Sequence, residues 1–195
     1  DIYVVDSMNN RVQKYTKDGQ FLLSWGESGC AEGQFNRPYG INLDSDQNVY
    51  VVDWGNDRIQ KFNAVGEFLK SFGSSSAEKG TDLDHPAGVA VDSDGDVYVT
   101  DWGNKRVKIF DPDGDVLTCL YGDATEMSKW AREVVESNPD VVKAFNRMKD
   151  LSSLGKFERP VGIEIDDQDR IIITDKSEHF QKFTNQILGR SNIDI

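Results

Sequence analysis

One hairpin-like sequence recurs along the chain at a nearly constant interval. The stretch Asn48–Phe62 returns as residues 96–110, and weaker copies cover residues 2–15 and 171–183. In the two best copies a run of β-branched and aromatic residues leads to a Trp-Gly-Asn turn, and a second such run follows. Gly and Asn tolerate the backbone of a tight reversal, so each copy has the pattern of a β-hairpin. A hairpin that returns at a fixed interval predicts a repeat architecture.

The first run of each copy ends in an aspartate, and the spacing between these aspartates gives the length of the repeat. Asp6, Asp53 and Asp101 are 47 and 48 positions apart, and Asp175 follows Asp101 after 74. The complete units also have a strand-like run before the hairpin and another after it. Each unit therefore reads as four short antiparallel strands in a meander, and such units predict the blades of a β-propeller.

We therefore expect one all-β domain over residues 1–195, with about four four-stranded blades. The blades are expected at about 1–26, 35–73, 83–122 and 157–195, the first without its first strand. The longer interval before Asp175 leaves room for an insertion at about 125–152. There Thr125 can cap one helix and Asn138-Pro139 can begin a second, and apolar stripes follow in both. We expect a short helical hairpin packed on the body of the protein.

The net charge limits the class of partner. Asp and Glu number 34 against 22 Lys and Arg, which gives a net charge of −12. A nucleic acid must be met by enough cations to displace its counterions, so this balance argues against it. A mean hydropathy of −0.56 and the lack of a long apolar run argue against a membrane span. Without an initiating Met or a secretory signal, we expect a processed or excised piece, and its compartment stays open.

The residues of the repeat resemble those of the NHL repeat, whose pattern runs Pro-x-Gly, an Asp-rich turn, then Tyr-Val-x-Asp-x-x-Asn-x-Arg. The second unit carries it as Pro38, Gly40, Asp44, Tyr50, Asp53, Asn56 and Arg58, and the third as Pro86, Gly88, Asp92, Tyr98, Asp101, Asn104 and Arg106. The first unit supplies Tyr3, Asp6, Asn9 and Arg11, and the fourth keeps Pro160, Gly162, Asp166 and Asp175 but has no matching Arg. The resemblance implies an NHL-type propeller.

NHL propellers usually have about six blades, so about four predict a partial or truncated propeller. An open arc leaves two sheet faces uncovered, and such faces promote association. Three outcomes stay open: missing blades of a longer chain, a homodimer, or closure within the chain by residues 192–195.

Two groups of residues are candidates for ligand binding. The turn inside each hairpin and the linkers between blades should lie on one rim, which places Trp54 and Trp102 together as aromatic platforms or as packing against the next blade. Just before the inner strands, Arg37, His85 and Arg159 precede the three prolines and Tyr39 follows the first of them, so all four should crowd the mouth of the central channel. They predict a small basic cluster suited to an anionic group, or residues that merely cap the ends of strands.

The signature residues themselves predict a structural role. Asp, Asn and Arg recur together as Asp6, Asn9 and Arg11, as Asp53, Asn56 and Arg58, and as Asp101, Asn104 and Arg106. Their regularity favours an ion pair or a backbone contact over ligand capture. The stretch Asp92-Ser-Asp-Gly-Asp96 superficially suits calcium, but its Gly is two residues early for an EF-hand loop. Turn formation is the favoured interpretation.

Enzymatic interpretations find little support in the residues. The resemblance also implies the amidating lyases, which use zinc, but zinc needs three or four convergent ligands and the chain has only His85 and His179. No nucleophile motif or phosphate-binding loop is present. We therefore expect no catalytic residue, metal or cofactor, with calcium or zinc as an alternative.

The sequence predicts a non-catalytic platform for a protein or peptide ligand. One alternative is a metal-dependent lyase or hydrolase of the NHL or lactonase type, completed by missing blades or a second copy. The other is an RNA-binding NHL domain.

Overall fold

The computed structural model describes residues 1–73, 82–122, 156–166, 170–176 and 186–189. The helical hairpin expected at about 125–152 lies outside these residues, as does the closing strand expected at 192–195. Within the described ranges no helix has both the length and the apolar character needed to cross a membrane.

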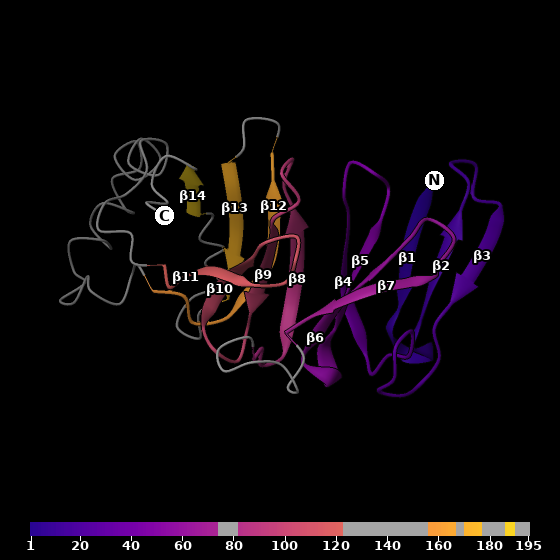
Figure 1. The fold of residues 1–195 in the computed structure, drawn as a ribbon, viewed down its shortest axis with the longest axis horizontal. Helices are drawn as coiled ribbons and strands as arrows, with labels where there is room; N and C mark the ends of the chain where they lie inside the picture. Colours follow the sequence, from indigo (N-terminus) through magenta and orange to yellow (C-terminus); the bar gives the residue numbers. More distant parts are fainter. Residues whose placement is uncertain (74–81, 123–155, 167–169, 177–185, 190–195) are drawn as a thin grey trace, which may run out of the picture.

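The strands form four antiparallel sheets, each built from strands that follow one another in the chain (Figure 1). The first sheet has β1 (Ile2–Asp6), β2 (Arg11–Tyr15) and β3 (Phe21–Trp25). The second has β4 (Pro38–Leu43), β5 (Val49–Asp53), β6 (Arg58–Phe62) and β7 (Phe68–Phe72), and the third has β8 (Pro86–Val91), β9 (Val97–Asp101), β10 (Arg106–Phe110) and β11 (Val116–Leu120). The fourth has β12 (Pro160–Ile165), β13 (Arg170–Asp175) and β14 (Gln186–Gly189).

The repeated hairpins form as the sequence predicts. β5 and β6 pair from Val49 opposite Phe62 to Asp53 opposite Arg58, around the 3-10 turn η2 (Trp54–Asn56). The first unit has the equivalent turn η1 (Ser7–Asn9). Each turn ends on a residue in the left-handed region, which reverses the chain toward the next strand: Asn10, Asp57 and Lys105, with φ of 51°, 53° and 56°.

The core lies between successive sheets because neighbouring residues of a strand point to opposite faces. Val49 and Val51 pack toward the first sheet, in a cluster with Val12. Tyr50 and Val52 point the other way and pack against the third sheet. The next interface is made by Ala90, Tyr98, Val107, Ile109, Phe157, Ile171 and Ile173. Successive sheets thus cover each other at the faces where they meet.

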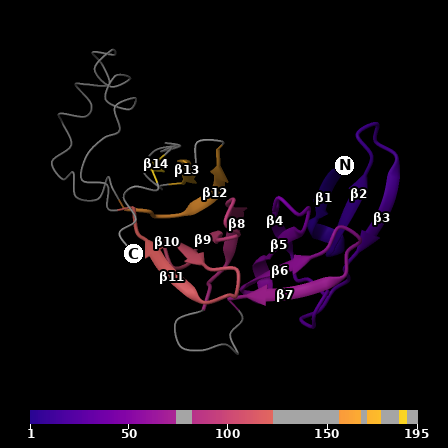
Figure 2. The same ribbon diagram turned by 45° about the horizontal axis from the view of Figure 1, so that its top comes forward.

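The four sheets follow one another along an arc (Figure 2). Strands β4, β8 and β12 lie on its inner side, β3, β7 and β11 on its outer side, and β8 contacts both β4 and β12. The described residues form no closed sheet. An all-β fold of propeller blades, open over the described part of the chain, confirms the fold expected from the repeats.

The fourth sheet differs from the predicted hairpin. The sequence copy runs to Phe183, whereas β13 pairs with β14, where Gly189 lies opposite Arg170. In this copy Glu178 stands near the place of the signature Asn, and no Arg follows Asp175 at the matching position. The Arg that pairs with the signature Asp in the other units therefore has no counterpart in the sequence of this copy.

Candidate functional site

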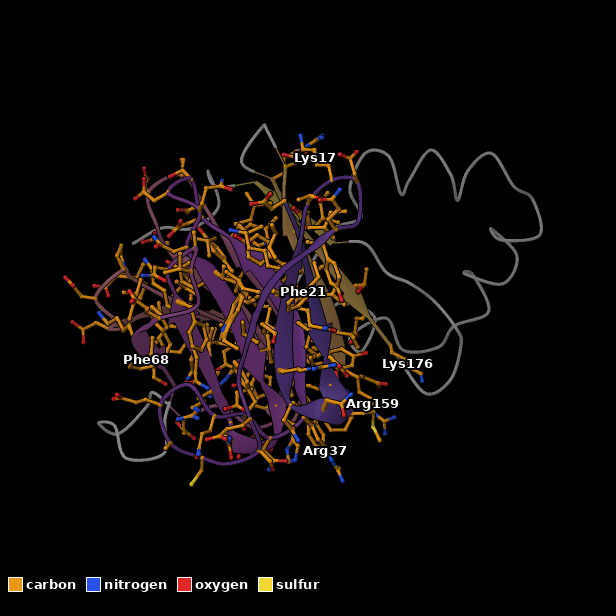
Figure 3. All side chains as sticks on the ribbon, turned by 90° about the vertical axis from the view of Figure 1, so that its right-hand side faces the viewer. Lys17, Phe21, Arg37, Phe68, Arg159 and Lys176 are labelled. Atoms are coloured by element: carbon orange, nitrogen blue, oxygen red, sulfur yellow. The ribbon has the colours of Figure 1, made fainter. Side chains whose placement is uncertain are left out.

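The inner strands begin at the same end of the arc as the hairpin turns. Arg37, Arg159 and Lys176 gather at this end in Figure 3, and Lys17 lies at the opposite end. A cavity of about 530 Å³ opens here. We call it the turn-end pocket, and its lining residues are Ser7, Met8, Arg37, Tyr39, Trp54, Ala87, Trp102, Arg159, Val161 and Lys176. All four blades contribute to it.

A row of rings and one guanidinium connects successive blades at this pocket. The ring centroids of Trp54 and His85 are 4.3 Å apart, and those of His85 and Trp102 are 6.2 Å apart. The guanidinium carbon of Arg159 lies 5.7 Å from the centroid of the Trp102 ring, within the range of a cation–π contact. His85 and Arg159 each precede the inner strand of the next blade. Both tryptophans therefore pack against a neighbouring blade and also line the pocket.

Backbone contacts between blades fix where the residues before the inner strands lie. The backbone N–H of Arg37 donates to Asn10 Oδ1, and that of His85 donates to Asp57 Oδ1, each over 2.7 Å. Arg37 and His85 both have a positive φ, of 53° and 52°. The acceptors come from the hairpin turn of the preceding blade. The positions of these two side chains therefore depend on the contact between blades.

The residues predicted for ligand binding come together here. Arg37, Tyr39, Trp54, Trp102 and Arg159 line the pocket, and His85 packs between its two tryptophans. The sequence interpretation placed them in two groups on one rim, and the structure joins the groups. Whether they bind a ligand stays a prediction.

Several lining residues were not predicted. Ser7 and Lys176 occupy the places of Trp54 and Trp102 in the outer units, so alignment of the repeats could have identified them. Met8, whose side chain is exposed, has no equivalent in the motif. Ala87 and Val161 follow the inner-strand prolines and could have been found by the same alignment.

His85 lies beside two carboxylates. Its Nδ1 contacts Asp84 Oδ1 and lies 4.0 Å from Asp57 Oδ1. Each of these three residues offers one atom that could coordinate a metal ion, and the three atoms lie within 4.8 Å of one another. Zinc requires three or four convergent ligands, and His85 Nδ1 and Asp57 Oδ1 already take part in hydrogen bonds. The arrangement holds His85 against Trp54.

The signature residues hold the hairpin turn and the incoming linker together. Asp53 is fully buried, and its Oδ2 accepts from Arg58 Nε at 2.8 Å and from Asn56 Nδ2 at 2.9 Å. Its Oδ1 accepts the backbone N–H of Asn36, just before β4. The third unit repeats these contacts with Asp101, Asn104, Arg106 and the backbone of Asp84, and the first unit pairs Asp6 with Asn9 and Arg11.

The acidic turns at the opposite end use their carboxylates for the backbone. Asp44 Oδ1 accepts the N–H groups of Asp46 and Asn48, and Asp92 Oδ1 accepts those of Asp94 and Asp96. Burial acts to raise the pKa of Asp44, but hydrogen bonds from Asn48 and Lys61 outweigh it, and the pKa lies below its usual value. These contacts agree with the turn interpretation of the Asp-rich stretches.

The NHL repeat family matches the sequence at two places, residues 35–62 and 83–110. These stretches run from before β4 to the end of β6 and from before β8 to the end of β10. No curated protein matches the chain at a significant level.

Solved structures with a similar fold include two enzymes and a protein complex. A catalytically inactive virginiamycin B lyase from Staphylococcus aureus, solved with quinupristin, is 16% identical with a TM-score of 0.53, over 89% of this chain and 44% of that one. A chain of the nidogen–laminin complex is 17% identical with a TM-score of 0.54, over 89% of this chain and 50% of that one. A luciferin-regenerating enzyme is 11% identical with a TM-score of 0.52, over 91% of this chain and 49% of that one. This chain thus spans half or less of the length of each, and the likeness is one of fold.

The two matched repeats coincide with the two complete blades, and the blades wrap as they do in propellers. The chain therefore carries two NHL repeats within an open β-propeller fold.

Proposed function

We propose that the chain is a non-catalytic binding module that takes a protein or peptide ligand at the turn-end pocket. The observation that carries the proposal is the composition of the pocket. It combines two half-buried tryptophans and an exposed tyrosine with basic side chains, and no carboxylate is among its described lining residues. Aromatic and Arg side chains are enriched where proteins bind other proteins.

The scaffold around the pocket supports this proposal. The lining residues are presented by turns and strand ends whose backbone is hydrogen-bonded between blades, so the surface is preformed. A chain of similar fold occurs in the nidogen–laminin complex, which is an assembly of proteins. A rigid scaffold that presents side chains on loops is a common design for binding.

The proposal is tested by selecting peptide ligands and then measuring how pocket variants of the chain bind them. Peptides are selected from a random displayed library on the purified chain, and their affinities are measured by calorimetry. We expect Trp54→Ala together with Trp102→Ala to weaken the selected peptides by at least about tenfold, since aromatic hot-spot residues dominate such contacts. Circular dichroism and thermal unfolding establish that the variant is folded.

The control removes a different exposed aromatic. Phe21 begins the outer strand β3 and is 57% exposed, away from the pocket (Figure 3). Phe21→Ala should leave peptide affinity unchanged. A folded double Trp variant that binds the selected peptides as well as the original chain would refute the proposal.

A second candidate is a metal-dependent lyase or hydrolase, as the fold of virginiamycin B lyase suggests. The observation in its favour is the convergence of Asp57, Asp84 and His85 beside the pocket. The chain alone would then supply part of a site, with other blades or a second copy completing it. Elemental analysis of the purified protein tests this candidate, and less than stoichiometric zinc or calcium would count against it.

A further inference from the structure

The turn-end pocket concentrates positive charge on an acidic protein. The chain has a net charge of −12, yet Arg37, Arg159 and Lys176 line the pocket without a lining carboxylate among the described residues. Other basic side chains of the blades form ion pairs within the fold, as Arg58 does with Asp53 and Arg106 does with Asp101. The pocket is therefore a local exception to the charge of the chain.

Two of its cations have no structural partner in the described part of the chain. Arg37 is exposed, and within the described residues it hydrogen-bonds through its backbone N–H and not through its guanidinium. Lys176 is also exposed, and its backbone N–H donates to the carbonyl of Arg159. Neither side chain forms an ion pair within residues 1–73, 82–122, 156–166, 170–176 and 186–189. Their charges are available to a ligand.

Apolar surface lies among these cations. Tyr39 is 59% exposed and Met8 is 91% exposed, and both line the pocket with the two tryptophans. Exposed apolar side chains that cluster beside polar groups mark interaction sites. The row of Trp54, His85 and Trp102 gives this surface a fixed shape. A ligand that matches it must carry both an anionic group and an apolar group.

We propose that the pocket recognises a peptide carboxylate that lies next to an apolar side chain. This inference rests on the proposed function and specifies its ligand class. A guanidinium offers a planar fork that fits a carboxylate, and a charge-assisted hydrogen bond is roughly twice as strong as a neutral one. The apolar neighbour packs on the aromatic surface.

The shape and charge of the chain favour a peptide over RNA. Single-stranded RNA is held along a groove whose cations follow many phosphates, with aromatic side chains under successive bases. Here the three cations surround one cavity, and the opposite end carries acidic turns such as Asp44–Asp46 and Asp92–Asp96. One compact cationic site suits one carboxylate.

Two kinds of carboxylate have this chemistry: the C-terminus of a chain and the side chain of an internal Asp or Glu. Four synthetic peptides separate them. The first ends in Leu-Phe with a free carboxylate, and the second is its amide. The third carries an internal Glu-Phe pair between blocked ends, and the fourth replaces that Glu by Gln.

Calorimetry against the whole chain at low ionic strength gives the test. We expect at least one carboxylate peptide to bind about tenfold or more tightly than its neutral counterpart. The pair that shows this difference identifies the source of the carboxylate. Arg37→Gln with Lys176→Gln should remove the preference while leaving the neutral peptides unchanged. Lys17→Gln, which removes an exposed cation at the opposite end, should keep it.

Equal binding of charged and neutral twins would overturn the carboxylate inference and leave the proposed peptide platform intact. Failure of library-selected peptides to depend on the tryptophans would instead overturn the platform itself. A single-stranded RNA that binds more tightly than every peptide, with affinity falling steeply as salt rises, would overturn the inference in favour of nucleic acid.

Discussion

Asp53 joins three segments of its blade through one buried carboxylate. It accepts from Asn56 in the hairpin turn, from Arg58 and Gln60 at the start of β6, and from the backbone of Asn36 before β4. Arg58 in turn donates to two carbonyls of the incoming linker. A buried carboxylate with this many donors is satisfied, and removing its charge leaves the guanidinium without its partner.

We expect Asp53→Asn to lower the free energy of unfolding by about 3 kcal/mol, the cost typical of breaking a buried ion pair. Asp6→Asn is the matched control, because the Arg11 side chain of that pair is 41% exposed and Asp6 is 21% exposed. The control should cost much less. Urea unfolding followed by circular dichroism measures both. An equal loss of unfolding free energy in the two variants would show that burial of the ion pair does not determine how much it contributes to stability.

At the scale of the elements, the sequence predicts the hairpins well and the inner strands less well. The hairpin expected over Asn48–Phe62 forms as β5 and β6, because alternation and the turn residues agree. The inner strands β4 and β8 begin at Pro38 and Pro86, inside the Pro-x-Gly motif that precedes the apolar run of each unit. Proline has no N–H to donate, and pairing there is interrupted by a bulge, which a simple strand pattern does not reveal.

The candidate site was predictable in position but not in extent. Repeat topology places Trp54, Trp102 and the residues before the inner prolines at one end of the blades, and the structure agrees. That His85 would lie between the two tryptophans depends on how far adjacent blades are rotated, which the sequence does not specify. The pairing of β14 with β13 was missed because the fourth copy lacks the residues that define a short turn.

Close approach of the inner strands depends on glycine. A Cβ added at Gly88 would lie 2.7 Å from the carbonyl oxygen of Val161 in the next blade. We expect Gly88→Ala to cost about 1–3 kcal/mol, because β8 and β12 must move apart. At Gly162 the nearest atom is Thr174 Oγ1, the end of a side chain in the same sheet, so Gly162→Ala should cost less. Thermal unfolding compares the two, and the reverse order would contradict this account.

For the whole molecule, the uncovered face of the first sheet is the feature with the largest consequence. Tyr3 and Val5 pack toward the second sheet, whereas Ile2 and Val4 point away from it and are 46% and 42% exposed. In the second sheet the equivalent positions, Val49 and Val51, are completely buried against their neighbour. The outer face of the first sheet thus has the apolar pattern of a covered blade without a cover in the described part of the chain.

We expect this face to drive association of the chain as studied. Light scattering should give a molar mass that rises above 21.9 kDa with concentration, since apolar sheet faces of this kind are buried in propellers. Val4→Lys places a charge in the face and should lower the mass at equal concentration. Leu69→Lys is the control, because Leu69 is 48% exposed on the outer strand β7 and belongs to no sheet-to-sheet cluster. A mass of one chain at every concentration, or an equal effect of both variants, would mean that the open face does not govern assembly.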